Sequence, residues 1–213
     1  DAWTKYYKPD ENTPNSVVSY YVKGALVALC LDLKLRQLTE QQTSLDTVMR
    51  QLWLNYGKVG KGVNNNTIQD ICQSLINTNL NEFFNHCLYS TEELPFVTLL
   101  SEQGVQLSYK YDNNKQQAIA CLGVRGQMAE GGYQLQNVWH GSAADLAGLS
   151  AGVVIIAVDG LKVTAQFEKN LATYAIGDTV MIHFFRRDEL MQLPVKLLAS
   201  QPEQCSLTIN NDC

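Results

Sequence analysis

The spacing of the apolar residues changes near Gly104, and this change limits which folds the chain can adopt. Before that point, apolar side chains recur every three or four residues, the spacing of an amphipathic helix. The run from Ser44 to Gly57 is one such stripe and predicts one buried helix face, formed by Leu45, Val48, Met49, Leu52, Trp53 and Tyr56. After that point, Val105, Leu107 and Tyr109 alternate with polar residues, which is typical of a half-buried strand. The sequence therefore predicts an α+β fold in two domains.

The same patterns give the expected boundaries of these domains. We expect an all-α helical segment over residues 1–103, whose longest helix runs from about residue 17 to residue 38. A β-barrel or sandwich domain with two short helices follows over residues 104–200, and a polar C-terminal tail over residues 201–213. One short helix is expected to begin at Ser142, a residue type that favours helix starts, and the other to cover residues 165–174.

Composition excludes some classes of partner. The 213 residues include 16 lysines and arginines against 21 aspartates and glutamates, a net charge of −5. Nucleic-acid binding needs concentrated positive charge, so we expect no nucleic-acid partner. The longest apolar run, Ala25 to Leu31, is far shorter than the roughly 20 residues that cross a bilayer, so we expect no membrane span.

The cysteines and histidines argue against a metal site within this chain. No two of the six cysteines have the spacing of metal ligands, and Cys30, Cys72 and Cys87 fall on apolar helical faces, where we expect buried thiols. This usage mildly favours a reducing, cytoplasmic location, while a periplasmic one stays open. The three histidines are far apart and no HExxH motif occurs, so a self-contained zinc hydrolase is excluded.

Residues 141–160, GSAADLAGLSAGVVIIAVDG, resemble the PDZ domains of bacterial proteases. The resemblance covers about residues 104–200 and implies that the β domain is PDZ-like. In such a module a peptide C-terminus adds a strand to a sheet edge, and backbone N–H groups hold its carboxylate. By this resemblance Leu122, Gly123 and Val124 are the carboxylate loop and the start of the binding strand. Phe167 and Leu171 are expected to line or support the groove, with an ordinary core role as the alternative.

Residues 1–36 are similar to the region that follows the zinc site in the glycyl aminopeptidase family of metallopeptidases. Residues 44–57 and 90–100 continue the resemblance, and a PDZ domain follows in that family too. The family has a thermolysin-like domain whose zinc is bound by two histidines of an HExxH helix and a downstream glutamate. The resemblance implies that this chain is the C-terminal part of such an enzyme. It would then carry no cofactor, with zinc only in the parent protein, and its partner would be the missing N-terminal part of the catalytic domain.

One catalytic residue is expected from that resemblance. The segment Tyr21-Val22-Lys23-Gly24-Ala25 matches the Tyr-x-Lys-Gly-Ala pattern of zinc aminopeptidases, in which the tyrosine hydroxyl stabilises the oxyanion of the tetrahedral intermediate. The resemblance therefore gives Tyr21 this role in the intact enzyme. Tyr20 is the rival, because a shift of one residue exchanges the two.

Two functions follow from the sequence. In the first, the chain is the C-terminal fragment of a zinc-dependent aminopeptidase that acts on peptides, is inactive alone, and carries a PDZ module for peptide C-termini. In the alternative, the parent protein has lost its zinc site and is a non-catalytic peptide-binding or scaffold protein.

Overall fold

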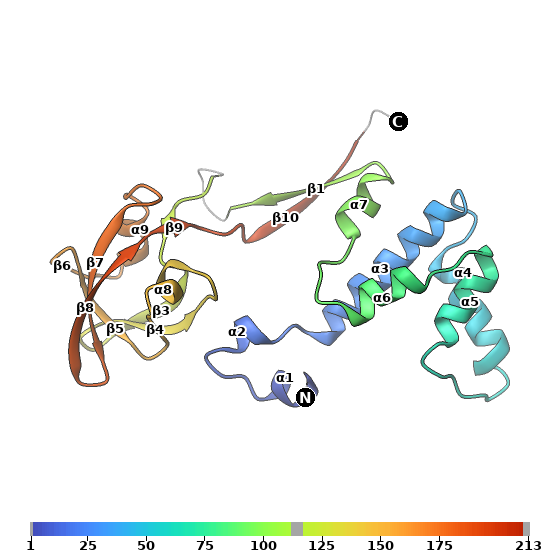
Figure 1. Cartoon of the computed structure of the whole chain (residues 1–213), viewed down its shortest axis with the longest axis horizontal. Coiled ribbons are helices and arrows are strands. Elements are labelled where there is room, and N and C mark those ends of the chain that lie inside the picture. The colour runs from blue at the N-terminus through green and yellow to red at the C-terminus, as the bar shows by residue number, and fades with distance from the viewer. Residues whose placement is uncertain (1, 112–116, 211–213) are drawn as a thin grey trace. The chain divides into compact units, whose positions relative to one another are not determined.

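A computed structural model describes residues 2–111 and 117–210 of the chain, so the last residues of the expected tail, 211–213, lie outside it. Packing divides the chain into two units (Figure 1). The helical unit is formed by Ser19–Ser108 and the residues from Ser206 onward. The sheet unit is formed by Tyr109–Cys205 together with the N-terminal residues up to Val18. The mixed helix and sheet content confirms the predicted α+β class.

The helical unit holds the elements that the first half of the sequence predicts. They are α3 Tyr20–Leu38, α4 Leu45–Leu52, the π-helix η1 Trp53–Gly57, α5 Thr67–Ile76, α6 Asn81–Tyr89 and α7 Phe96–Ser101. Helix α3 begins three residues later than expected, because Ser19 caps it with a side chain that accepts a hydrogen bond from Val22 N. Asp32 of α3 accepts hydrogen bonds from Arg36 and from the backbone N–H of Leu45, which ties the start of α4 to α3.

Two small apolar clusters hold the helical unit together. One joins Leu35 of α3 to Val48 of α4 and to α5 and α6, and the other joins Cys30 and Cys87 to α7. The predicted burial of Cys30, Cys72 and Cys87 is confirmed.

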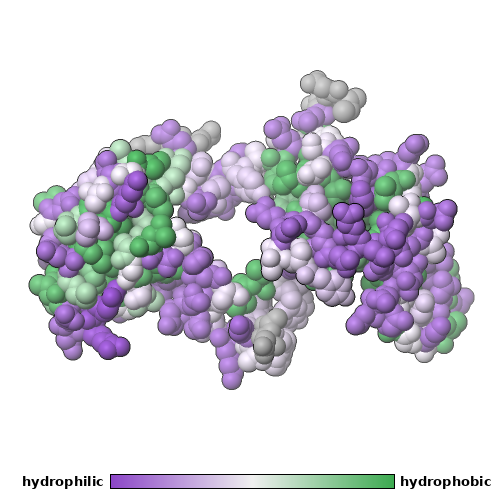
Figure 2. All heavy atoms as spheres, in the orientation of Figure 1, coloured by the Kyte–Doolittle hydropathy of each residue, from purple (hydrophilic) through white to green (hydrophobic). Residues whose placement is uncertain are grey.

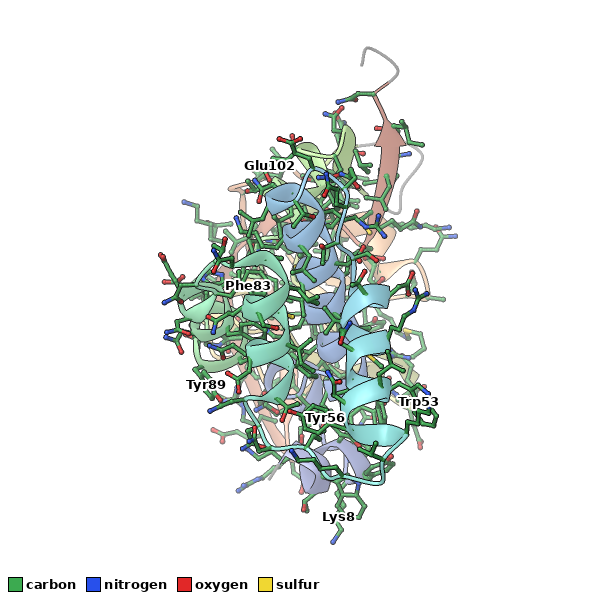
Figure 3. All side chains as sticks on the ribbon, turned by 90° about the vertical axis from the view of Figure 1, so that its right-hand side faces the viewer. Lys8, Trp53, Tyr56, Phe83, Tyr89 and Glu102 are labelled. Carbon is green, nitrogen blue, oxygen red and sulfur yellow. The ribbon has the colours of Figure 1, made fainter. Side chains whose placement is uncertain are left out.

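The stripe predicted between residues 44 and 57 is buried only in part. Val48 is fully buried, but Met49 and Trp53 are exposed, and Figure 3 shows Trp53 at the outer edge of its helix. Residues 53–57 wind as a π-helix, with the N–H of Lys58 bonded to the carbonyl of Trp53. The helical spacing correctly predicts a helix here, but the prediction of a continuous buried face is wrong.

The sheet unit is antiparallel. Its main sheet has the order β3-β4-β5-β7-β8, with β6 paired to β5, and β2 pairs separately with β9. The strands are β2 Ala120–Cys121, β3 Val124–Ala129, β4 Gly132–Val138, β5 Val154–Val158, β6 Leu161–Lys162, β7 Thr179–Arg186, β8 Glu189–Lys196 and β9 Leu198–Ala199. The helices are α1 Ala2–Tyr7, α2 Thr13–Ser16, α8 Ala143–Leu146 and α9 Phe167–Leu171.

One continuous core fills the sheet unit. Its largest fully buried side chains include Phe184, Ile155 and Leu135, which come from β7, β5 and β4. Ser142 caps α8 as predicted, because its hydroxyl accepts a hydrogen bond from Asp145 N. Helix α9 is shorter than the predicted residues 165–174.

A two-stranded ribbon of β1 Val105–Lys110 and β10 Gln204–Ile209 completes the described chain. Each of the two strands runs from one unit into the other. Residues 204–209 of the expected polar tail therefore form a strand. Their alternation of Cys205, Leu207 and Ile209 with polar residues has the strand period, which the sequence prediction overlooked.

Candidate functional site

A cavity of about 640 Å³ lies in the sheet unit beside β2 and the start of β3. Four segments line it: residues 119–124, residues 139–143, residues 198–203, and α9 through Glu168 and Leu171. Of the residues predicted to bind a peptide, Leu122, Gly123, Val124 and Leu171 meet at this cavity.

Gly123 is the residue that the local backbone most requires to be glycine. Its φ is +68°, a left-handed conformation that side chains with a Cβ rarely adopt. A Cβ added there would lie 2.4 Å from the Cβ of Ser142, so the loop that begins at Trp139 packs directly on Gly123. The carbonyl of Gly123 accepts a hydrogen bond from Trp139 N at 3.1 Å, and that of Leu122 from Ala144 N at 2.9 Å. These bonds hold the predicted carboxylate loop from one side.

Strand β3, which begins at Val124, lies at one end of the main sheet. Its pairing with β4 starts at Val124 and Val138, and within the described residues its other edge has no strand partner. An unpaired edge offers backbone N–H and C=O groups to an added strand. The cavity therefore adjoins an edge that can accept a peptide by strand addition.

Helix α9 places its two predicted site residues differently. Leu171 lines the large cavity, whereas Phe167 is buried in the core with its ring centroid 4.7 Å from that of Tyr133. Phe167 and Leu171 also line a second, smaller cavity of about 60 Å³. The Tyr133 hydroxyl donates a hydrogen bond to Glu168 at the start of α9. Burial, and then this bond, raise the pKa of Tyr133. Phe167 thus supports the helix from within the core.

The charged groups at the cavity are acidic, with one histidine. Glu168 and Glu203 line it, and the described lining contains no lysine or arginine. Burial raises the pKa of the Cys121 thiol, and the negative charges of Glu168 and Glu203 raise it further. His140, also in the lining, lies with Nδ1 3.2 Å from the Asp145 carboxylate. The sequence prediction assigned none of these side chains to the site, because only the fold brings them to the cavity beside Gly123.

The wall that contains Trp139 and His140 is held from outside by the N-terminal segment. The Asn15 side chain donates from Nδ2 to the carbonyl of Val138 at 2.7 Å, and its Oδ1 accepts from His140 N at 2.9 Å. The amide of Asn137 donates to the carbonyl of Glu11 at 3.0 Å. No local sequence signal predicts these contacts, because the partners are more than 120 residues apart.

Tyr21 is not among the residues that line this cavity and lies in the first turn of α3. Its side chain is 63% exposed, and its ring centroid lies 4.4 Å from that of Tyr20. Among the described residues no group of three or more histidine, cysteine, aspartate or glutamate side chains is placed to hold a metal ion. The role of Tyr21 in the intact enzyme stays a prediction.

The stretch Thr13–Leu38 is long and apolar enough to cross a membrane by length and composition alone. Only 17% of its most apolar window is buried. This is weak evidence for a span, because core helices of soluble proteins and signal sequences meet the same criteria.

Comparison with known proteins identifies both parts of the chain. A PDZ domain model matches residues 120–197, and the model of the M61 glycyl aminopeptidase family matches residues 1–27. The chain is thus similar to the M61 glycyl aminopeptidase family at its N-terminus and to a PDZ domain over residues 120–197. The resemblance predicted from the sequence is confirmed.

A solved structure agrees with this assignment. The chain is similar to an aminopeptidase N family protein from Idiomarina loihiensis, with 38% identity over 99% of this chain and a TM-score of 0.84. The match covers 38% of that protein, so the chain spans well under half of its relative.

Other matches are weaker. A serine endoprotease from Yersinia pestis is 16% identical over 41% of this chain and 32% of its own, with a TM-score of 0.36. The HtrA-type protease AlgW with decapeptide is 19% identical over 40% of this chain and 31% of its own, with a TM-score of 0.37. Nothing is inferred from scores this low. No curated protein matches the chain.

Proposed function

We propose that the PDZ domain binds peptides through their free C-terminal carboxylate, by strand addition to β3. The observation that carries this proposal is the cavity at Gly123, which joins a glycine-bearing loop to the unpaired edge of the sheet. A positive φ turns the backbone of such a loop so that N–H groups can face an anion. The edge of β3 would bind the preceding residues of the peptide through backbone hydrogen bonds.

The test compares peptides that differ only in the chemical group at the C-terminus. Labelled decapeptides with varied C-termini, each made as free acid and as amide, are titrated against the chain and followed by fluorescence anisotropy. The proposal expects saturable binding of at least one acid and at least about tenfold weaker binding of its amide, because a charged hydrogen bond is lost. Equal binding of acid and amide, or no binding of any peptide, contradicts it.

A chain variant tests the same loop. Gly123→Ala places a methyl group against Ser142 and is expected to abolish peptide binding. Gly160→Ala is the matched control, because Gly160 has a φ of +78° and a Cβ added there meets nothing within 4 Å. Both variants carry the same backbone strain, so only the contact at the cavity differs. Melting curves of both variants show whether the fold survives.

We also propose that the intact protein is a zinc-dependent aminopeptidase, of which this chain is the C-terminal part and is inactive alone. The family match at residues 1–27 and the similarity to an aminopeptidase N family protein support this. The chain, stripped of metal and given zinc, is expected to leave an aminoacyl reporter uncleaved. Hydrolysis above background contradicts the proposal.

In that intact enzyme, Tyr21 would donate a hydrogen bond to the oxyanion formed when water attacks the peptide carbonyl. Losing one such donor typically lowers kcat by about 100- to 1,000-fold. When the chain is joined to the zinc-bearing part of its parent, we expect this loss for Tyr21→Phe and little change for Tyr20→Phe. The reverse result assigns the role to Tyr20.

A further inference from the structure

The segment from Val138 to His140 lies between two sets of hydrogen bonds. On one side, Trp139 N donates to the carbonyl of Gly123, the central residue of the proposed carboxylate loop. On the other side, Val138 O and His140 N bond to the side chain of Asn15. One short segment therefore bonds both to the Gly123 loop and to the Asn15 side chain.

Asn15 is itself held in a compact turn. The carboxylate of Asp10 accepts hydrogen bonds from Asn12 N and the Thr13 hydroxyl, and Asp10 N donates to Thr13 Oγ1. Helix α2 follows, with Pro14 in its first turn, and Nδ2 of Asn15 also donates to Oδ1 of Asn12. Because these local bonds fix the turn, it presents the Asn15 amide with little freedom to move away.

The bonds of Asn15 reach the cavity through direct contacts. Trp139 and His140 both line the cavity, and the next turn packs Ser142 against Gly123. The carboxylate of Asp145 accepts a bond from Gly141 N and lies beside His140, which closes this wall on its far side. A shift of residues 138–140 would therefore move Trp139 N, which bonds to the Gly123 carbonyl. It would also move Ser142, which packs on Gly123.

We propose that Asn15 is a positioning residue for the peptide cavity, and that it couples the M61-family segment at the N-terminus to peptide binding by the PDZ domain. This inference rests on the proposed function, because it concerns the same cavity. Asn15 lies within residues 1–27, which match the aminopeptidase family model. Because Asn15 bonds to the wall of the cavity, a change that moves this segment would alter that wall. A peptide bound at the wall would in turn favour the position of the segment in which Asn15 bonds to Val138 and His140.

Amide hydrogen exchange in the full chain without peptide tests the positioning directly. In Asn15→Ala the His140 amide loses its acceptor, and we expect its exchange to rise by about tenfold or more. The Trp139 amide keeps its own acceptor, so a rise there, expected at about threefold or more, reports loosening of the wall toward Gly123. Unchanged exchange at Trp139 overturns the proposal, because Asn15 would then hold only its own contact.

Peptide affinity tests the consequence. The probe is the free-acid decapeptide that binds the unaltered chain most tightly, and we expect Asn15→Ala to weaken its Kd by about three- to tenfold, as for the loss of one or two hydrogen bonds. Asn15→Asp keeps the acceptor for His140 N but loses the donor to Val138. Its Kd should therefore lie between that of the unaltered chain and that of Asn15→Ala. An unchanged Kd in Asn15→Ala overturns the proposal.

The control and the failure cases are distinct. Asn55→Ala removes a comparable exposed amide of η1, which donates to Gln51 of the adjoining α4, and it should change neither readout. If it weakens binding as much as Asn15→Ala, the proposal is wrong. If no peptide binds the unaltered chain, the proposed function fails, and exchange at Trp139 still decides whether Asn15 positions the wall.

Discussion

The two units bury their apolar residues in different ways. The sheet unit has one continuous core, and its fully buried side chains come from most of its strands and helices. The helical unit has two smaller clusters, and the apolar stripe of α4 and η1 leaves Met49 and Trp53 exposed. Apolar residues are visible as green patches on the surface in Figure 2. The difference teaches that a regular apolar stripe predicts a helix, whereas burial requires a neighbour that covers it.

The largest expected effect is the loss of a core aromatic from the sheet unit. Phe184→Ala removes a ring that is fully buried, and we expect it to lower the free energy of unfolding of that unit by about 3–5 kcal/mol. Trp53→Ala removes a larger side chain that is 61% exposed, and should cost less than about 1 kcal/mol. Chemical denaturation followed by circular dichroism measures both. Equal losses would mean that burial of the side chain does not set the cost of removing it.

Thiol reactivity should follow the same contrast of burial. Burial raises the pKa of Cys30 and of Cys72 to about 11, so both thiols stay protonated and covered at pH 8. Cys205 is exposed. We expect an alkylating reagent to modify Cys205 at least about 100-fold faster than Cys30 or Cys72, as read by peptide mass mapping. Fast labelling of Cys30 in the native chain would show that the helical unit opens readily.

Tyr133 should make the stability of the sheet unit depend on alkaline pH. Burial, and then its bond to Glu168, raise the pKa of Tyr133 above the ordinary value of 10.0. The folded chain therefore holds this proton more tightly than the unfolded chain does, so stability is full below pH 10 and falls as pH rises beyond it. Tyr133→Phe should cost about 1 kcal/mol at pH 7 and flatten this dependence. A profile unchanged by the substitution, measured from pH 7 to 11, would assign the loss to other groups.

The smallest effect concerns the acidic lining of the cavity. Glu203→Gln removes an exposed negative charge near Gly123, so a peptide carboxylate should bind about two- to fivefold more tightly at low salt, as for a surface charge pair. Glu189→Gln removes a charge of the same kind from β8, outside the lining, and should leave the Kd unchanged. Equal affinities of the Glu203 variant and the unaltered chain would show that solvent screens this charge fully.

Local sequence signals predicted much of the architecture. The helical spacing and the cap at Ser142 placed helices, because each depends on neighbours a few residues away, whereas the PDZ-like domain and the predicted carboxylate loop came from the family resemblance. The same signals failed for the stripe at Met49 and Trp53, where burial depends on contacts outside the helix. They left the role of Phe167 open between groove and core, because its helical position is the same whether it lines a groove or packs on Tyr133.

The sequence by itself determined the element types, the change of period near Gly104, and both family resemblances, since motif order and spacing are properties of the chain alone. Only the tertiary structure decided that residues up to Val18 pack with the PDZ domain. It also decided that the Asn15 side chain bonds to Val138 and His140 in the wall of the cavity and that two glutamates line the cavity. These contacts join residues separated by tens to more than a hundred positions, and no local propensity specifies which distant groups meet.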